Sequence, residues 1–256
     1  MIFDTHAHYD ADAFQEDREE LIASLSSCNV KRVTNVSAEW KSLEATKALT
    51  EKYDFIYGAY GIHPDDVGVL DAQKLEELKN YLQLPKAVAV GEIGLDYYWN
   101  KEEKEKQIYW FEQQMLLAKE VDKPVIIHSR DAAEDTMKAV KKIDPGTVGG
   151  VVHCYAYSRE MAREYVDMGL FIGVGGVVTF KNGRRLKETV ASLPLSAFVL
   201  ETDCPYLAPE PNRGKRNSSL NLPYVVRMIA ELKGVTVEEV EEATWENACR
   251  LYRLDQ

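Results

Sequence analysis

Short apolar runs alternate with segments of helical periodicity along the whole chain. Eight runs have the length and composition of buried strands. They are Ile2–Asp4, Val30–Val36, Phe55–Ile62, Ala87–Ile93, Pro124–Ile127, Gly149–Val152, Leu170–Val178 and Phe198–Glu201. Between them, apolar residues recur at steps of three and four, as at Leu75, Leu78 and Leu82, and Lys101–Val121 is a longer segment of this kind. The pattern predicts eight strands with helices between them.

The spacing of these runs predicts a closed barrel. Successive strand ends lie roughly 22 to 36 residues apart, the size of one strand–helix unit in a barrel of ~250 residues. A doubly wound open sheet is the alternative fold, but such a sheet normally binds its ligand at one switch point. Here polar residues follow strands one, four, five, six and eight, and only a closed ring brings those ends together. We therefore expect a single (β/α)8 TIM-barrel domain over residues 1–256.

Every histidine of the chain lies at or just past the end of one of these runs. The five histidines, and the two carboxylates in the same kind of position, are His6, His8, His63, His128, His153, Glu92 and Asp203. Functional groups of such barrels gather at the C-terminal ends of the strands. Histidine is the commonest transition-metal ligand, and carboxylates suit harder cations. The sequence therefore predicts one metal site built from distant parts of the chain.

The positions of the individual residues in this set suggest that the site holds two cations. The imidazoles of His6-Ala7-His8 lie on one face of an extended segment, within reach of one cation. Glu92 has small apolar neighbours, where a lone carboxylate is costly to keep charged, so we expect it to bind metal and to bridge two cations. A salt-bridged core glutamate is the alternative. His128 and His153 each end an apolar strand, which suggests ligands to a second cation, and Asp203 is expected to bind metal and accept a proton from bound water.

Residues beside these ligands receive other roles. His63 ends the third strand and is expected to contact substrate or the leaving oxygen rather than a cation. Glu201 faces the same way as Asp203 but deeper, either to orient a ligand histidine or to pair with a helix end. Cys154 and Cys204 directly follow expected ligands, and strand alternation predicts that both point away from the site. Two cations ~3.5–4 Å apart generate hydroxide at neutral pH, so the expected reaction class is metal-assisted hydrolysis.

Basic residues cluster in the loops after the seventh and eighth strands, where such barrels commonly bind phosphate. Arg213, Lys215 and Arg216 lie in the loop after the eighth strand, and arginine suits bidentate phosphate contact. Arg130, just past the fifth strand, is a further candidate, whereas residues 181–187 are equally well explained as the solvated start of a helix. The net charge of −11 argues against a protein that coats nucleic acid nonspecifically. It allows one strand end to enter a cleft with basic rims.

Aromatic residues also follow two of the strands. Tyr97, Tyr98 and Trp99 follow the fourth, and Tyr155 and Tyr157 follow the sixth. Aromatic rings at a cleft mouth can stack on bases, although aromatic residues in loops more often simply pack.

Composition and the length of the apolar runs limit the class of protein and its expected location. The hydrophobic fraction of 45% supports a sizeable core, and the four cysteines show no CxxC spacing, which disfavours a zinc knuckle or a thioredoxin-type motif. The chain enters a strand-like run at once, which leaves no room for a secretory leader. No apolar run reaches the ~18 residues that span a bilayer. We expect a monomeric, cytoplasmic protein with no membrane partner.

Several segments match, in chain order, the motifs of one protein family. They are His6-Ala7-His8, Gly61-Ile62-His63-Pro64, Gly91-Glu92-Ile93-Gly94-Leu95-Asp96, His128-Ser129-Arg130-Asp131-Ala132, His153-Cys154, Glu201-Thr202-Asp203-Cys204-Pro205-Tyr206-Leu207 and Arg213-Gly214-Lys215-Arg216-Asn217. From the first strand to the eighth, the chain closely resembles the TatD family. The resemblance implies a metal-dependent deoxyribonuclease of the wider amidohydrolase superfamily, generally acting from the 3′ end of DNA.

The resemblance also implies roles for single residues. One cation would be held by His6, His8, Glu92 and Asp203, the other by Glu92, His128 and His153, with His63 on the substrate side. Asp203, Glu92 and His63 are thus the expected catalytic residues, and the expected substrate contacts are His63, Arg130, Arg213, Lys215 and Arg216. The expected cofactors are two divalent ions (Mg²⁺, Mn²⁺ or Zn²⁺), and the expected partner is the 3′ end of single-stranded DNA. An ester or amide hydrolase, such as an aminoacyl-tRNA deacylase, is the alternative.

Two segments depart from the family pattern. Tyr155-Ala156-Tyr157 stands where the family often has Phe-Ser-Gly, and Ser218-Ser219 stands where it often has Glu-Pro. Neither contains an expected ligand. Both are expected to lie where substrate would lie.

Overall fold

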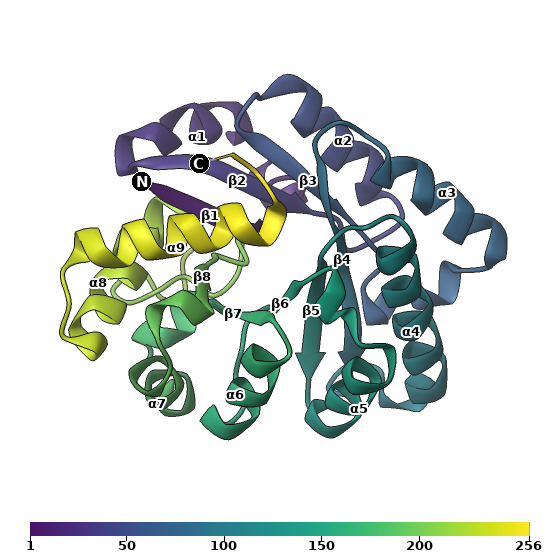
Figure 1. The fold of residues 1–256 in the computed structure, drawn as a ribbon. Helices are drawn as coiled ribbons and strands as arrows, with labels where there is room; N and C mark the ends of the chain where they lie inside the picture. Colours follow the sequence, from purple (N-terminus) through teal and green to yellow (C-terminus); the bar gives the residue numbers. More distant parts are fainter. Residues whose placement is uncertain (256) are drawn as a thin grey trace.

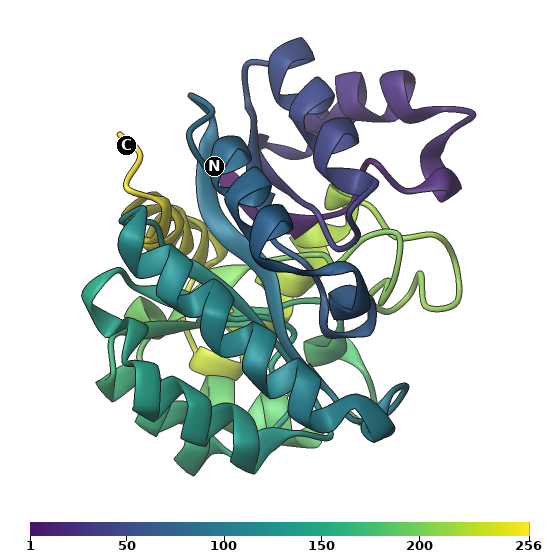
Figure 2. The ribbon, with the colours of Figure 1, turned by 90° about the vertical axis from the view of Figure 1, so that its right-hand side faces the viewer.

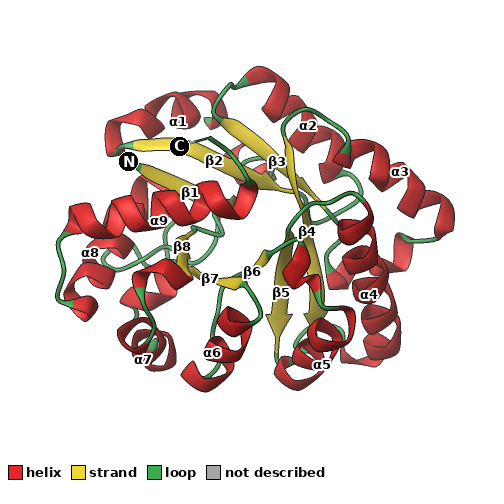
Figure 3. Ribbon diagram, viewed as in Figure 1, coloured by secondary structure: helices red, strands yellow, loops and turns green. Residues whose placement is uncertain are grey.

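The computed structural model describes residues 1–255 and contains one parallel sheet of eight strands in sequential order. The strands are β1 (Ile2–Ala7), β2 (Val30–Val36), β3 (Ile56–Tyr60), β4 (Ala87–Asp96), β5 (Val125–Arg130), β6 (Gly150–Val152), β7 (Leu170–Val174) and β8 (Phe198–Leu200). Just beyond β8, Cys204 bridges to Ala7 of β1, and the amide of Asp203 donates to the carbonyl of His6 at 2.9 Å. The strands therefore form a nearly closed ring inside the helices (Figure 3), which confirms the expected (β/α)8 barrel.

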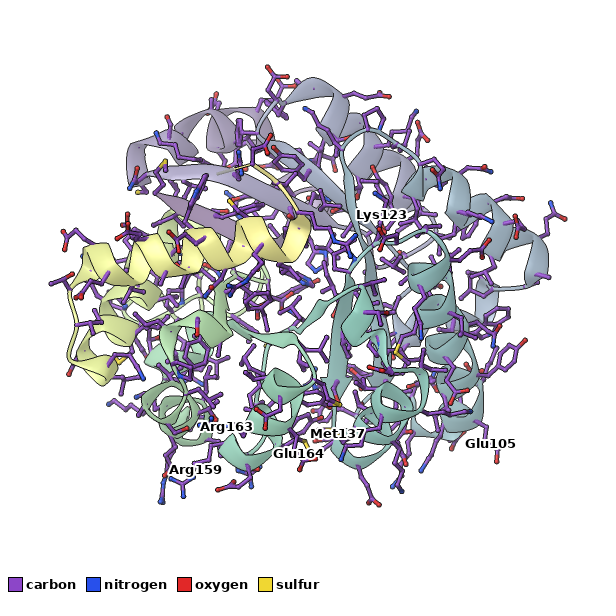
Figure 4. All side chains as sticks on the ribbon, in the orientation of Figure 1. Glu105, Lys123, Met137, Arg159, Arg163 and Glu164 are labelled. Carbon is purple, nitrogen blue, oxygen red and sulfur yellow. The ribbon has the colours of Figure 1, made fainter. Side chains whose placement is uncertain are left out.

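Nine α-helices in the described residues surround this ring. They are α1 (Arg18–Ser24), α2 (Ser42–Lys52), α3 (Ala72–Leu82), α4 (Lys104–Glu120), α5 (Ala133–Ile143), α6 (Arg159–Asp167), α7 (Arg184–Ser192), α8 (Leu222–Lys233) and α9 (Val237–Tyr252). Figure 1 and Figure 2 show them outside the strands, with α9 lying across β1 and β8. The exposed side chains of Glu105 on α4 and Arg159 on α6 point outward (Figure 4). None of the helices in residues 1–255 is long and apolar enough to cross a membrane.

Local sequence explains where several helices begin and end. The Asp71 side chain accepts a hydrogen bond from the amide of Lys74 at 2.8 Å and so caps α3. Thr236 and Glu239 form a reciprocal capping box at the start of α9. Gly234, with φ +67°, ends α8 in the left-handed conformation that glycine adopts without strain.

Several strand ends differ from the sequence-based expectation. β1 runs on to Ala7 rather than ending at Asp4, and β3 ends at Tyr60 rather than Ile62. β7 ends at Val174 rather than Val178, because the chain turns into a short 3-10 helix at Gly176–Thr179. β4 and β5 run further than expected, to Asp96 and Arg130, and these two residues are paired across the ladder. His128 therefore lies inside a hydrogen-bonded strand instead of just past its end, and Glu92 lies inside β4 as expected.

Two hydrophobic layers hold the ring. The larger joins the strands to the surrounding helices. The smaller takes apolar residues from seven strands and from α9: Phe3, Val36, Ala59, Val88, Ala89, Ile126, Val151, Val199, Trp245, Ala248, Cys249, Leu251 and Tyr252. Residues from almost every strand can meet only inside a ring. Phe3 lies 6.0 Å from Trp245 and 5.7 Å from Tyr252 between ring centroids, so α9 packs directly on this inner layer.

Gly94 is the point where β4 passes closest to β5. Its φ of +152° is rarely adopted by other residues, and a Cβ here would lie 1.9 Å from the carbonyl oxygen of His128. We expect Gly94→Ala to lower the free energy of unfolding by about 2 kcal/mol or more, as measured by urea denaturation. Gly68→Ala is the control, because its Cβ would meet only the flexible end of Lys106, at 3.3 Å. Equal denaturation midpoints for the two variants would contradict the close approach.

Candidate metal centre

Two histidines at the end of β1, one within the strand and one just past it, form the first half of the centre. The Nε2 atoms of His6 and His8 lie 3.0 Å apart. His8 Nδ1 lies 2.7 Å from the carbonyl oxygen of Val36, so this nitrogen carries a proton, and Nε2 is the nitrogen that is placed to bind a cation when it loses its own proton. Asp203 Oδ1 lies 3.4 Å from His8 Nε2 and 3.9 Å from His6 Nε2. Ligand atoms about 2.1 Å from a tetrahedral cation are about 3.4 Å from one another, so the three side chains fit around one ion.

Glu92 divides its two oxygens between two groups of histidines. Oε2 lies 3.6 Å from His6 Nε2 and 3.9 Å from His8 Nε2. Oε1 lies 2.7 Å from His128 Nδ1 and 3.4 Å from His153 Nε2. Burial opposes the charged form of this carboxyl, but His153 and His128 outweigh burial and hold its pKa well below the ordinary value. An ionised carboxylate with one oxygen toward each group has the geometry of a bridging ligand.

Two acidic residues face the far nitrogens of the second histidine group. His128 Nε2 lies 3.1 Å from Asp96 Oδ2, and His153 Nδ1 lies 3.3 Å from Glu201 Oε2. Carboxylates in this position fix the tautomer and orientation of metal-binding imidazoles. Glu201 therefore takes the first of its two expected roles.

The position of Glu201 is itself fixed from two sides. Its Oε1 accepts a hydrogen bond from the amide of Cys154 at 2.6 Å. A Cβ on Gly173, in β7, would lie 2.3 Å from its Oε2. The carboxylate thus lies directly against the backbone of β7, in space that any larger residue would fill.

The charge balance of the cluster favours cations. Burial lowers the pKa of a histidine, yet Glu92 and Asp96 raise that of His128 to about 10, and Glu201 and Glu92 raise that of His153 to about 8. The same opposition holds at His8, where Asp203 raises the pKa to about 9. Because the carboxylates outweigh the cost of burying positive charge, a divalent ion can replace these protons. Imidazole and carboxylate donors suit zinc, manganese and related ions.

His63 lies beside the second group rather than apart from it. Its ring centroid is 4.3 Å from that of His128, and one of its nitrogens lies within 4.8 Å of ligand atoms of both His128 and Glu92. Its Nδ1 accepts a hydrogen bond from the amide of Asp65 at 3.2 Å. Burial, with His128 adding to it, lowers its pKa to about 3, so the ring is neutral. This placement allows His63 to contact either substrate or a cation.

The expectation for Cys154 is wrong, whereas Cys204 is buried in packing as expected. The sulfur of Cys154 lies within 4.8 Å of ligand atoms of both His153 and Asp203. β6 ends at Val152, and Cys154 has φ +46°, so strand alternation no longer sets its direction. Burial, reinforced by Asp203 and Glu201, raises the pKa of this thiol well above the ordinary value, so it is protonated.

The basic side chains that we expected to contact phosphate differ in whether they already pair with another residue of the protein. Arg216 forms an ion pair with Asp17 at 2.5 Å and donates to the carbonyl oxygen of Ala13 at 2.7 Å, so its guanidinium is already engaged. Arg130, Arg213 and Lys215 are exposed and have no salt-bridge partner within residues 1–255. In the 181–187 cluster, Arg184 pairs with Glu188 at 2.7 Å on α7, which matches the solvated-helix interpretation.

The two departures from the family pattern lie mainly in packing, which corrects the expectation that they line the substrate site. Ser219 is fully buried, donates to Asp4 Oδ2 and lies 2.7 Å from the hydroxyl of Tyr9. Tyr155 is buried, and its hydroxyl donates to the carbonyl oxygen of Ser158 at 2.5 Å. Both side chains find partners within the protein because the loops after β6 and β8 fold back on the barrel.

Two acidic residues near the centre were not among the expected site residues. Asp4 is fully buried beneath the centre and accepts hydrogen bonds from the amide and hydroxyl of Thr202 at 3.0 and 2.7 Å. Burial raises its pKa to about 7. Asp96 supports His128, as described above. Asp4 precedes His6 by two residues in an apolar run, a signal that could have been read from the sequence.

Metal binding should be visible without any substrate. Adding Mn²⁺ or Zn²⁺ at 100 times its Kd to metal-stripped protein stabilises the folded state by about 2.7 kcal/mol per site. For a chain of this size we expect Tm to rise by about 5–10 °C for each occupied site, as measured by calorimetry. The His8→Ala variant should show a smaller rise, because it loses a ligand. An equal rise in that variant would show that the ions bind elsewhere.

Comparison with known proteins identifies the family. Residues 3–253 match the family model described as "TatD related DNase". The chain is 43% identical over 255 residues to the uncharacterized metal-dependent hydrolase YabD of Bacillus subtilis, covering 100% of both chains. It is 33% identical to the 3′-5′ ssDNA/RNA exonuclease TatD of a Rahnella strain, covering 98% of this chain and 95% of that one. The crystal structure of YjjV, a TatD homologue from Escherichia coli, superposes with a TM-score of 0.93 at 31% identity, covering 99% of this chain and 98% of the other. With its barrel and its cluster of histidines and carboxylates, the chain belongs to the TatD family of metal-dependent hydrolases.

Proposed function

We propose that the protein is a two-metal phosphodiesterase that shortens single-stranded DNA from its 3′ end. The observation that carries the proposal is Glu92, whose two oxygens face two separate groups of imidazoles. That arrangement fits a pair of cations bridged by one carboxylate, the arrangement used for in-line displacement at phosphorus. The exonuclease name of the Rahnella relative supports nucleic acid as the substrate class.

Different residues of the chain would have different roles in such a reaction. When bound, the cations supply a nucleophile at neutral pH and offset charge on the phosphoryl group. Asp203 is ionised, because His8 and His153 outweigh its burial and lower its pKa, so it can accept the proton of the attacking water. Neutral His63 lies on the other side of His128, where it can contact the leaving oxygen. Arg130, the exposed last residue of β5, is placed to contact a phosphate.

A labelled oligonucleotide tests this function directly. Metal-stripped protein is incubated with 5′-labelled single-stranded DNA, and Mg²⁺, Mn²⁺ or Zn²⁺ is added back separately. The expected result is a metal-dependent ladder that shortens from the 3′ end and is absent with His128→Ala, the control for contaminating nucleases. Absence of cleavage with every metal would overturn the proposal. In that case an aminoacyl-tRNA becomes the next substrate to try, since the same cations can polarise a carbonyl.

The free basic residues should affect binding more than turnover. Reversing the charge of both Arg213 and Lys215 is expected to raise KM about tenfold, and more for longer DNA, because each substitution removes a contact to a phosphate. We expect kcat to change little. Steady-state kinetics on strands of several lengths measures this effect. Reversal at Lys187, which belongs to α7 and forms no ion pair within the described residues, is the control. An unchanged KM in the double variant would remove this loop from the substrate path.

A further inference from the structure

Two neighbouring aromatic side chains stand exposed directly after β4. In residues 1–255, the exposed large apolar side chains are Met1, Tyr98, Trp99, Tyr109, Leu116 and Tyr206. Trp99 has the largest exposed fraction of the set, 67%, and the residue before it, Tyr98, is 55% exposed. Contiguous exposed apolar surface is typical of binding sites, and the loops after the strands carry the functional groups of such barrels.

These rings and one arginine form a defined corner. Tyr98 and Trp99 meet edge to face, with centroids 4.7 Å apart and planes at 89°. The guanidinium carbon of Arg130 lies 4.0 Å from the Tyr98 centroid and 5.5 Å from that of Trp99. We call Tyr98, Trp99 and Arg130 the aromatic corner. A guanidinium that contacts a ring through its face keeps its N–H edges available for a phosphate.

The aromatic corner is tied to the metal centre through a single carboxylate. Asp96 Oδ1 accepts hydrogen bonds from the amides of Tyr98 and Trp99, at 2.8 and 3.0 Å. The other oxygen, Oδ2, lies 3.1 Å from His128 Nε2. Gln107 holds the same turn, since its side chain bonds both the amide and the carbonyl of Asp96 at 2.9 and 3.0 Å. The exposed rings therefore have a fixed position relative to the phosphate-cleaving end of the site.

We propose that the aromatic corner stacks on the base of the nucleotide next to the scissile phosphate, while Arg130 contacts that phosphate. The inference rests on the proposed function and adds a base-binding subsite to it. Every nucleobase has a π face, so stacking tolerates all four bases. No reading of base edges is needed, which suits an enzyme that removes successive nucleotides of any sequence.

Abasic DNA tests this subsite. One strand carries all its bases, a second carries a single tetrahydrofuran abasic residue near the 3′ end, and a third is abasic throughout. With the metal-loaded wild type, we expect KM to be about tenfold higher for the abasic residue. Trp99→Ala should raise KM on the intact strand by a similar factor and remove the difference between the strands. Cleavage of the fully abasic strand should be the same in both proteins.

Two further variants separate stacking from general damage. Trp99→Phe keeps a π face and should restore most of the preference for the intact strand. Tyr109→Ala removes an aromatic ring of similar exposure, 53%, on α4, and should behave as wild type. Equal KM values for intact and abasic strands in the wild type, or a preference that survives in Trp99→Ala, would overturn the subsite.

Binding distinguishes failure of the subsite from failure of the proposed function. Anisotropy of the labelled strands is measured with metal-loaded Asp203→Asn protein, with and without Trp99→Ala. If the protein binds the intact strand more tightly than the abasic strand, and this preference requires Trp99, the subsite is supported. This holds even if the wild type cleaves no strand, because the lack of cleavage would overturn only the proposed phosphodiesterase activity. Binding with no such preference overturns the subsite even if cleavage occurs.

Discussion

Asp203→Asn is expected to lower kcat by about 10³-fold or more while the barrel stays folded. Asparagine has the same shape, and the contact that holds this position, from the backbone amide to the carbonyl of His6, does not involve the side chain. The substitution removes an ionised carboxylate that faces His6 and His8, and with it the proton acceptor that we propose for the reaction. Loss of general-base catalysis alone costs about 10²–10⁴-fold. Steady-state kinetics gives kcat, and the thermal melt followed by circular dichroism reports the fold.

Asp135→Asn is the matched control for this substitution. Asp135 is also an aspartate near the strand ends, but it pairs with Lys104 at 2.6 Å and accepts from Tyr97, not from the histidine cluster. We expect it to retain wild-type kcat. If Asp203→Asn kept kcat within about threefold of the wild type, Asp203 would not be the base, because general-base catalysis is worth far more.

Glu92→Gln is expected to abolish turnover and to reduce the metal content from about two ions per chain to at most one, in keeping with a bridging carboxylate. Glu92 is the only residue of the cluster within residues 1–255 whose two oxygens face different pairs of histidines. Glutamine keeps one oxygen but presents an amide group, a hydrogen-bond donor, to the other pair. Elemental analysis of dialysed protein measures the metal content, and the labelled-strand assay measures turnover.

Glu201→Gln provides the comparison for this second variant. Glu201 is also buried, but the histidine with which it forms a salt bridge is His153, at the nitrogen that faces away from Glu92. We expect it to keep the ion at His6 and His8 and to weaken the other by about 10–100-fold. If Glu92→Gln retained two ions per chain, the bridging role would be wrong. If Glu201→Gln lost both, the effect would be one of folding rather than of ligation.

The sequence predicts the fold well because its main signals are local. Apolar runs and three- and four-residue steps lie within single elements, and all eight strands begin within one residue of their expected start. Strand ends are less predictable, since they depend on pairing with a neighbour. β4 and β5 extend because each pairs with the other out to Asp96 and Arg130. β7 stops early where the chain turns into a short 3-10 helix.

The same distinction applies to the site. The ligand candidates could be predicted because each ends or interrupts an apolar run, and the structure brings all six of them together. Side chains whose direction depends on a turn could not be predicted. Cys154 faces the cluster because its φ is positive. The engagement of Arg216 by Asp17 and of Ser219 by Asp4 depends on segments about 200 residues apart, a relation that no local pattern carries.

The contacts between β1 and the segment after β8 also determine at which stage of its synthesis the protein can become active. His6 and His8 emerge from the ribosome first among the ligands, whereas Asp203 comes last, and Asp4 contacts Thr202 across a separation of 198 residues. A nascent chain folds as its segments emerge, but it lacks this ligand and the closing contacts until the segment after β8 has been translated. Until then the growing polypeptide is an incomplete ring whose set of candidate metal ligands lacks Asp203.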